Sequence, residues 1–355
     1  MNIVRQHQPI ARSKITELTS LSQQSVHRLI VRLTCKKFLA SKKAVVSGRG
    51  KPSPRIVLDN GTSVSFGISV RTDKVEFIAC NLSGDQLATV SLRTNPNDRK
   101  GVLSELKSII SRWLKSEEFE RRFPIGVGIS MQGYRTTHQN YFTNPELIEN
   151  WSRVSVDAEV SSALGLASFA ENNGTCAAIA ELHCGGGSRH KSLAYISFDH
   201  GFGGGIIWEN QAIIGGFGNA GELGKLFSQK EMSHRPALGV LVAHLQKRGV
   251  SLNDFQDFLQ NFDPTWPGVD EWISDVAPML NRTIRAIWAV LDPEAIYFGG
   301  AAPEKLRDML IACCNPPPAN KFGEKLPFPA LLPSQLAGDA AARGAAILPT
   351  RQLIF

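Results

Sequence analysis

The chain has 355 residues, 43% of them hydrophobic and 20% charged, with a formal net charge of +7. These proportions are typical of a soluble globular protein with room for two or three domains. No stretch approaches the roughly 18 apolar residues of a membrane span, and the first residues lack the apolar core of a signal peptide, so we expect no membrane contact and a cytoplasmic location.

The positive charge is concentrated at the N-terminus. Residues 1–60 hold 12 Lys or Arg against two acidic residues, a net of +10, and the remaining residues hold 27 against 30, a net of −3. A basic segment on a near-neutral body is typical of nucleic-acid binding.

Within this basic segment, residues 10–33 predict two short helices joined by a tight turn. Ala11, Ile15 and Leu18 share one face of the first helix. The second helix, Gln23–Thr34, has Ser22 as a suitable N-cap, and its apolar face consists of Val26, Leu29, Ile30 and Leu33. Its other face carries amide, hydroxyl and guanidinium groups suited to base edges and phosphates, from Gln23, Gln24, Ser25, Arg28 and Arg32. A solvated amphipathic helix is the alternative.

Residues 44–58 alternate like a β-hairpin and favour the DNA-binding interpretation. The turn Gly48–Pro52 places Arg49 and Lys51 at a tip that fits the minor groove of A·T-rich DNA. We therefore predict a winged helix-turn-helix over residues 1–60, with double-stranded DNA as its partner. Only Met1–Gln8 remain for its first helix, and a native start upstream of Met1 is one hypothesis.

The most unusual stretch is the glycine-rich Asp199–Lys225. Gly201 and Gly203 to Gly205 separate two strand-like runs, 193–198 and 206–208, and predict a hairpin whose glycine turn suits a phosphate. Glu222 follows on a loop of small residues, where a carboxylate is a good acceptor for sugar hydroxyls. A purely structural role for these loops is the alternative.

This stretch resembles the second phosphate motif and the A-G-E-x-G-H signature of the ROK family, which comprises sugar kinases and sugar-responsive repressors. Further segments resemble the family in the same order, namely 125–133, 170–173, 298–300 and 343–346, so that the resemblance covers roughly residues 65 to 350. It implies an α/β fold, a winged helix-turn-helix followed by a two-lobed actin-like body of the sugar kinase and Hsp70 ATPase type. The wing sequence is also similar to that of ROK repressors.

We expect a DNA-binding domain over residues 1–60 and a ROK domain over residues 61–355. Lobe one comprises about 61–170 plus 336–355, and lobe two about 171–335. The β-rich runs 64–70, 75–80 and 87–92, the helix 100–114 and the strand 125–129 give the βββαβ order with which an actin-like lobe begins.

The resemblance also indicates that kinase chemistry is lost. The family's catalytic aspartate corresponds to Asn173, an amide that accepts no proton near neutral pH. The first phosphate loop corresponds to Ser69–Asp73, which lacks the glycines, and Asp199 in the second loop repels a triphosphate. The family's zinc histidine corresponds to Lys225, and the six cysteines are scattered without metal spacing. We expect no catalytic residue, no cofactor and no metal site.

The sugar-binding residues are better preserved. By resemblance, Gly133, Asn172 and Glu222 hold the sugar, and Asn173 holds a hydroxyl that it no longer deprotonates. Lys225 favours a phosphorylated or acidic sugar there, or else it pairs with Glu222 or points to solvent. The resemblance thus predicts a sugar-responsive transcriptional regulator, a repressor acting as a homodimer or homotetramer. The alternatives are a ROK-type ATP-dependent sugar kinase and a ligand-independent DNA-binding protein whose body only dimerises.

Overall fold

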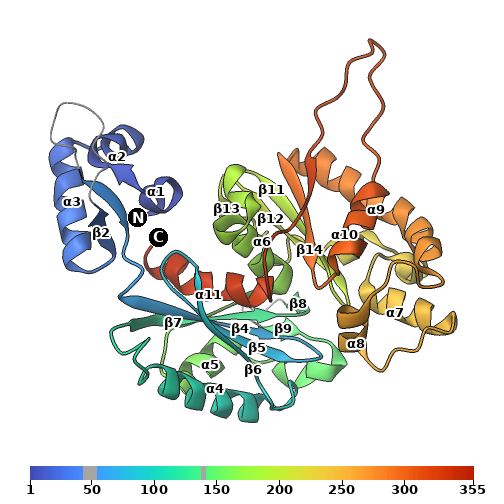
Figure 1. The fold of residues 1–355 in the computed structure, drawn as a ribbon, viewed down its shortest axis with the longest axis horizontal. Helices are drawn as coiled ribbons and strands as arrows, with labels where there is room; N and C mark the ends of the chain where they lie inside the picture. Colours follow the sequence, from blue (N-terminus) through green and yellow to red (C-terminus); the bar gives the residue numbers. More distant parts are fainter. Residues whose placement is uncertain (43–53, 137–140) are drawn as a thin grey trace.

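The computed structural model describes residues 1–42, 54–136 and 141–355. Figure 1 shows a small N-terminal module and two larger units, each built around a five-stranded sheet. The last helix, α11 (Ala340–Leu353), returns across the first of these units, so both chain ends lie near the N-terminal module. In the part of the chain described, every helix is too short or too polar to cross a membrane.

The N-terminal module combines three helices with a small antiparallel sheet in the order β1-β3-β2. Its elements are α1 (Asn2–His7), β1 (Ile10–Ala11), α2 (Arg12–Thr19), α3 (Gln23–Cys35), β2 (Leu39–Lys42) and β3 (Arg55–Leu58). Three helices followed by two adjacent strands are the arrangement of a winged helix. The predicted wing tip, with Arg49 and Lys51, lies outside the described residues.

Helix α3 begins where the sequence predicts it. The Ser22 hydroxyl accepts a hydrogen bond from the backbone N–H of Ser25 at 3.2 Å, which confirms the N-cap. Val26 and Ile30 are buried, but Leu29, expected in the core, is 46% exposed, and Leu18 of α2 is 41% exposed. Both leucines therefore lie outside the core that the described residues of the module form.

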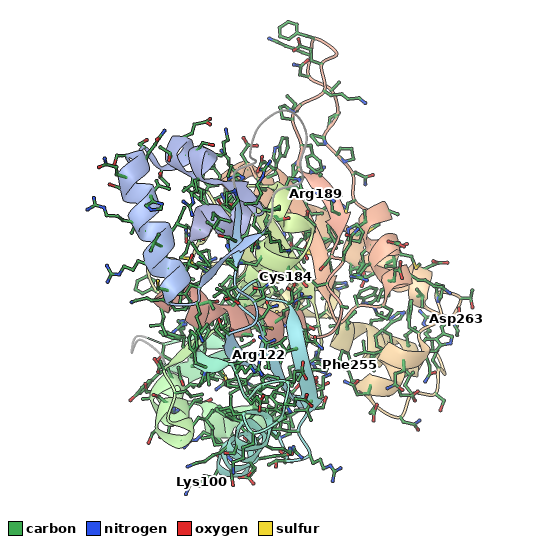
Figure 2. All side chains as sticks on the ribbon, turned by 60° about the vertical axis from the view of Figure 1, so that its left-hand side comes forward. Lys100, Arg122, Cys184, Arg189, Phe255 and Asp263 are labelled. Carbon is green, nitrogen blue, oxygen red and sulfur yellow. The ribbon has the colours of Figure 1, made fainter. Side chains whose placement is uncertain are left out.

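The module packs on the body through residues at the C-terminus. Ile354 and Phe355, which follow α11, pack against its hydrophobic core. The guanidinium of Arg5 lies over the Phe355 ring, 5.8 Å from the centroid. Arg122, labelled in Figure 2, fixes the connecting segment by donating to the carbonyl oxygens of Asn60 (2.6 Å) and Ser63 (3.3 Å).

The first unit has the strand order β10-β7-β4-β5-β6, in which β10, β7 and β4 are parallel and the others antiparallel. Helices α4 and α5 cover one face of this sheet and α11 the other (Figure 1). The elements are β4 (Ser63–Val70), β5 (Val75–Cys80), β6 (Gln86–Ser91), α4 (Arg99–Trp113), β7 (Phe123–Met131), α5 (Val156–Leu164) and β10 (Ser168–Asn172). A short hairpin, β8 (Tyr134–Arg135) and β9 (Phe142–Thr143), follows β7. The predicted βββαβ order is confirmed.

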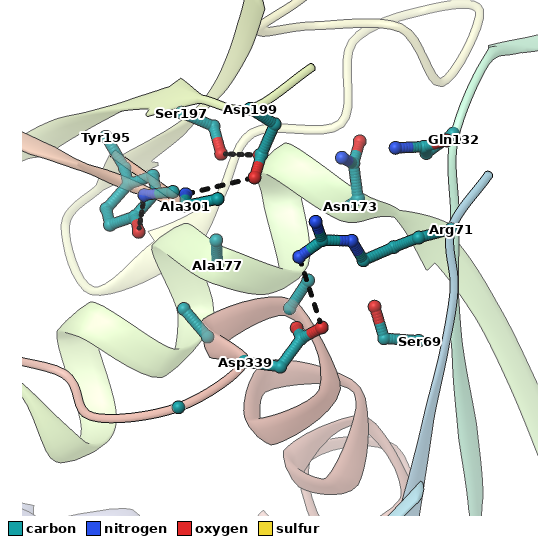
Figure 3. A pocket seen from close by; sticks show the side chains of 14 residues that line it. Ser69, Arg71, Gln132, Asn173, Ala177, Tyr195, Ser197, Asp199, Ala301 and Asp339 are labelled. Atoms are coloured by element: carbon teal, nitrogen blue, oxygen red, sulfur yellow. Dashed lines mark hydrogen bonds and ion pairs between the residues drawn. The ribbon is translucent and has the colours of Figure 1, made fainter. Parts of the chain in front are cut away.

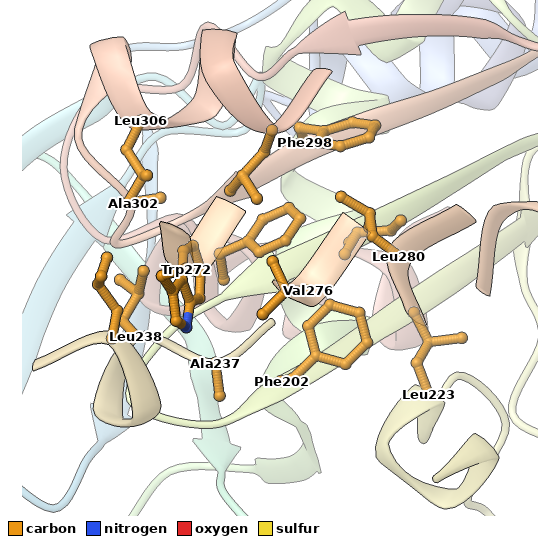
Figure 4. Packing of buried hydrophobic residues seen from close by; sticks show 14 of the residues in the cluster. Phe202, Leu223, Ala237, Leu238, Trp272, Val276, Leu280, Phe298, Ala302 and Leu306 are labelled. Carbon is orange, nitrogen blue, oxygen red and sulfur yellow. The ribbon is translucent and has the colours of Figure 1, made fainter. Parts of the chain in front are cut away.

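The second unit has the strand order β13-β12-β11-β14-β15. Its strands are β11 (Leu193–Phe198), β12 (Phe202–Trp208), β13 (Gln211–Ala212), β14 (Ala295–Gly300) and β15 (Ala330–Pro333). Its helices are α6 (Asn173–Cys184), α7 (Leu238–Lys247), α8 (Phe255–Asn261), α9 (Val269–Leu291) and α10 (Glu304–Ala312). Figure 4 shows the core between sheet and helices, where α9 contributes Trp272, Val276 and Leu280 at helical spacing.

The glycine-rich stretch differs from its prediction. The hairpin exists, but its turn is at residues 199–201, and Gly203 to Gly205 belong to strand β12, paired with Ser197 to Tyr195. Close packing explains Gly204 and Gly205, whereas a Cβ on Gly201 or Gly203 would meet no atom within 4 Å. A Cβ on Gly204 would lie 2.4 Å from the Tyr195 carbonyl oxygen, and one on Gly205 would lie 2.4 Å from that of Gly174 in α6. The glycine run therefore lets α6 approach the sheet and is no open phosphate loop.

Candidate functional site

The predicted DNA-contacting residues share the outer surface of helix α3. Gln23, Gln24, Arg28 and Arg32 are exposed, and Ser25 is half-buried at the cap of the helix. Arg12 of α2 lies beside this helix, with its Nη1 atom 3.0 Å from Nδ1 of His27. Amide and guanidinium groups thus face solvent along α3, while Val26 and Ile30 on its opposite face are buried in the core of the module.

Three of the predicted sugar-binding residues meet where strands β7 and β10 end. The two strands are parallel neighbours, with Asn172 in register with Met131. The Asn172 side-chain amide donates to Glu222 Oε1 at 2.6 Å and to the Gly133 carbonyl oxygen at 3.1 Å. Its oxygen accepts from the N–H of Gly174 at 2.7 Å and so caps α6. The structure therefore brings Gly133, Asn172 and Glu222 together.

The backbone conformation at position 133 requires glycine. Its φ is +101°, and a Cβ at this position would lie 2.1 Å from the Thr143 carbonyl oxygen of the adjacent hairpin. A larger residue would therefore displace both the hairpin and the carbonyl group that accepts from Asn172.

The Glu222 carboxyl is largely removed from water. Burial raises its pKa to about 7, against the opposing effects of the Lys225 charge and the Asn172 hydrogen bond. Near neutral pH the group is therefore present in both protonation states. A carboxyl of this kind can accept from one ligand hydroxyl or donate to another.

A cavity of about 600 Å³ opens beside this carboxyl, and we call it the Glu222 pocket. One wall is polar and the other, from α9, is aliphatic, and its main lining residues are Tyr134, Asn219, Glu222, Lys225, Ile287 and Val290. The volume is within the range of about 300–1,000 Å³ typical of small-molecule sites. The Lys225 ammonium group lies 3.9 Å from the centroid of the Tyr134 ring, a cation–π contact at the rim.

Two further residues that shape the pocket were not found from the sequence. Asn219 accepts from the backbone N–H of Arg135 at 2.8 Å and donates to its carbonyl oxygen at 3.0 Å, which joins the glycine loop to strand β8. Arg135 also forms an ion pair with Glu171 at 3.2 Å. The presence of an asparagine within a glycine-rich loop was the sequence signal for the contact of Asn219 with Arg135. No sequence signal indicated the ion pair of Arg135 with Glu171.

Asn173 lies in a different place. It lines a separate, narrow cavity of about 50 Å³, which we call the Arg71 pocket, with Ser69, Arg71, Gln132, Asn173, Asp199 and Asp339 as its main lining residues (Figure 3). The structure therefore does not place Asn173 with the Glu222 group, although both flank the start of α6.

Charged side chains of the protein occupy the Arg71 pocket. Arg71 forms an ion pair with Asp73 at 3.0 Å and approaches Asp339 at 3.8 Å. Burial alone lowers the pKa of Arg71, but the charges of Asp199, Asp339 and Asp73 raise it on balance. Asp199 in turn accepts from the Ser197 hydroxyl at 2.6 Å. Arg71 and Asp199 belong to the two segments that resemble phosphate loops, and the Asp199 charge acts on Arg71 here, while the ion pairs of Arg71 are with Asp73 and Asp339.

No candidate metal centre accompanies these pockets. Over residues 1–42, 54–136 and 141–355, His, Cys, Asp and Glu side chains form no group of three or more able to hold a metal ion. Lys225, at the position of the family's zinc histidine, contacts Tyr134 instead.

Comparison with known proteins finds a ROK family match over part of the chain. Residues 65–236 match the model of the ROK family. The chain carries a ROK family domain. An uncharacterized Sinorhizobium fredii protein, y4fQ, is 23% identical over all of this chain and 90% of its own length. The xylose repressor of Bacillus subtilis is also 23% identical, over 63% of this chain but only 58% of the repressor, so the match spans less than two thirds of that protein.

Solved structures define the fold. A ROK family transcriptional regulator, a homologue of the E. coli MLC protein, superposes with a TM-score of 0.74 at 19% identity, covering 98% of this chain and 93% of the regulator. The ROK hexokinase of Thermus thermophilus superposes with a TM-score of 0.63 at 20% identity, covering 82% of this chain and 99% of the hexokinase. The expected α/β fold, an N-terminal winged helix-turn-helix followed by an actin-like body, is confirmed. Regulators and kinases both share this ROK body.

Proposed function

We propose that the protein is a sugar-responsive DNA-binding transcriptional regulator, a repressor whose ROK domain binds a sugar without phosphorylating it. The observation that carries the proposal is the contrast between the two pockets. Glu222, held by Asn172, faces an open cavity with hydroxyl-binding groups, whereas the position expected for nucleotide phosphates holds Arg71, Asp199 and Asp339.

The N-terminal module supplies the DNA-binding half of the proposal. It is strongly basic, and α3 presents Gln24, Arg28 and Arg32 to solvent in the way that a recognition helix presents side chains to the major groove. Arg49 and Lys51 would add minor-groove contacts from the wing. Relatives named xylose repressor and ROK family transcriptional regulator support the same assignment.

We further propose the domain division given above, 1–60 and 61–355 with two lobes, and an assembly of two or four copies. A pair of recognition helices reads two half-sites about one helical turn apart, so a ligand that changes the spacing of the modules changes operator affinity. Gly133, Asn172, Glu222 and Lys225 would contact the sugar, whereas Asn173 lines the separate Arg71 pocket. Operator binding implies a cytoplasmic location.

The test is binding of the purified chain, at one fixed moderate salt concentration, to fragments from upstream of its own gene, with unrelated duplex as competitor and a panel of free sugars. We expect a competitor-resistant complex that one sugar dissolves, and a Glu222→Gln protein that binds the same DNA without responding. Binding that unrelated duplex abolishes equally would contradict the proposal.

A sugar kinase remains the second candidate, because ROK kinases share the body and beta-glucoside kinases of Listeria are among the relatives. It requires a proton acceptor in place of Asn173 and an open phosphate site. Release of ADP in the presence of any sugar of the panel, lost in an Asn172→Ala protein, would establish it.

A further inference from the structure

A third cavity lies between the N-terminal module and the body. It encloses about 740 Å³ and is lined by α1, β2 and β3 of the module and by Ser83, His183 and Asn210 of the body. Figure 2 labels Cys184, the neighbour of His183, at this junction. We call the space the junction cavity, and none of its lining residues belongs to the Glu222 pocket or the Arg71 pocket.

Two guanidinium groups at or beside the junction cavity form no ion pair with the carboxylates that line it. Arg5 of α1 lines it beside His183, and Nη1 of Arg351 in α11 lies 3.1 Å from Nε2 of His183. Among the residues described, neither guanidinium forms an ion pair with a carboxylate. Arg5 contacts Asn2 and the Phe355 ring, and Arg351 contacts His183 and Gln211.

These two cations are also poorly hydrated. Burial lowers the pKa of Arg5 to about 10, with a further contribution from the charge of Arg351, and burial lowers the pKa of Arg351 as well. Removing a charged guanidinium group from water costs free energy unless an anion lies against it. The cost is higher when two such groups lie close together. The two guanidinium groups therefore have no anion close to them, and a ligand can supply one.

Part of the remaining lining is suited to hydroxyl groups, and Lys42 adds an exposed cation. Asp59 accepts from the N–H of Gly61 at 3.1 Å through one oxygen, and Asp85 accepts from the Asn81 amide at 3.0 Å through one oxygen. The second oxygen of each carboxylate receives no hydrogen bond from the described residues. Asn210 adds an amide with both donor and acceptor atoms. Carboxylates would repel an inorganic anion of high charge, but they accept readily from a polyol.

We propose that the junction cavity binds a small phosphorylated polyol, such as a sugar phosphate, with its phosphoryl group at Arg5 and its hydroxyls at Asp59, Asp85 and Asn210. The phosphoryl oxygens provide the anion that the guanidinium lacks, in the bidentate geometry that arginine favours. Because the lining comes from both the module and the body, a bound ligand holds the DNA-binding module in one orientation. This site is independent of the sugar site proposed at Glu222.

The test is calorimetric titration of the full chain with glucose 6-phosphate, inorganic phosphate and glucose. We expect glucose 6-phosphate to bind more tightly than inorganic phosphate. Arg5→Gln should weaken its binding roughly tenfold or more, the loss of one charge-assisted contact. Arg285→Gln, which removes an exposed arginine on α9, is the matched control and should bind as the natural protein does.

Two further variants make the outcome decisive. Asn210→Asp places a negative charge on the body side of the cavity without touching α1, and it should also weaken glucose 6-phosphate binding. Glu222→Gln should leave that binding unchanged. Equal affinity in the natural, Arg5→Gln and Asn210→Asp proteins would overturn the proposal. If glucose 6-phosphate binding were lost only in Glu222→Gln, the phosphate would bind at Lys225 in the Glu222 pocket instead. If inorganic phosphate bound as tightly as glucose 6-phosphate, the hydroxyl groups of the ligand would contribute nothing to binding.

Discussion

The Glu222 pocket and the Arg71 pocket both contain carboxyl groups that are partly removed from water, but the partners of these groups differ. Glu222 is held by the Asn172 amide and keeps a raised pKa beside a cavity of about 600 Å³. Asp339 and Asp199 face Arg71 across a space of about 50 Å³. A carboxyl that forms no ion pair can bind ligand hydroxyls, whereas carboxylates neutralised by the protein's own arginine contribute to the fold instead.

The largest expected effect tests the structural role of the Arg71 pocket. Arg71→Ala removes the cation between buried carboxylates, so we expect the free energy of unfolding to fall by about 3 kcal/mol. Urea unfolding measures it, with Arg93→Ala as a control at an exposed arginine of the same unit. An Arg71→Ala protein as stable as its control would mean that these charges are solvated and that the pocket is open to ligands.

The next effect tests the ligand role of the Glu222 pocket. Glu222→Gln keeps the shape and one acceptor but loses the charged form, and we expect the affinity for the effector sugar to fall about tenfold to a hundredfold. Sugar titration of the two proteins measures it. Glu209→Gln, at an exposed acid near the end of β12, should bind as the natural protein does. If the Glu222→Gln protein bound the effector sugar with full affinity, the Glu222 carboxyl would not be a ligand-binding group, and the two pockets would not differ in this respect.

The raised pKa of Glu222 predicts a pH dependence of stability. Its folded pKa of about 7 exceeds the usual 4.5, so the stabilisation is complete below about pH 4.5 and is lost as pH rises through 7. Relative to Glu222→Gln, we expect the natural protein to lose roughly 1–2 kcal/mol between pH 4.5 and 8, after allowing for partial exposure. Urea unfolding of both proteins across this range measures the difference, and parallel curves would show an ordinary pKa.

The smallest effect concerns the DNA-binding helix and leaves both pockets unchanged. Arg28→Gln should weaken operator binding by about 1 kcal/mol and reduce the slope of affinity against salt concentration by about one unit, as loss of one phosphate contact does. Sugar affinity and stability should not change. Arg285→Gln provides the matched surface control, and an unaltered salt slope in Arg28→Gln would place this face of α3 away from DNA.

Much of the fold could be predicted from the sequence because it follows local patterns. The strands at 64–70, 75–80 and 193–198 and the start of α3 were located within a residue or two. Leu29 was misplaced because the periodicity of a helix does not tell how wide a neighbouring sheet is. Gly203 to Gly205 were read as a turn because glycines that admit a close helix have the same composition as glycines that bend a chain.

The candidate site depended on information that is not local. Asn172 and Glu222 are 50 positions apart, and no spacing rule joins them, so only the family resemblance placed them together. The pairing of Arg71 with Asp339 spans a far longer separation and depends on where α11 begins. The resemblance indicated the loss of a phosphate loop, but it did not indicate that the vacated position would be occupied by a salt bridge.

Helix α11 connects regions that are otherwise far apart. Its N-cap, Asp339, accepts from the N–H of Ala342 at 2.9 Å beside the Arg71 pocket, and the residues after its other end, Ile354 and Phe355, pack in the core of the N-terminal module. Its 14 residues span about 21 Å. Because α11 contacts both regions, a tilt of this helix by a few degrees would shift the N-terminal module relative to the body without any change inside the module.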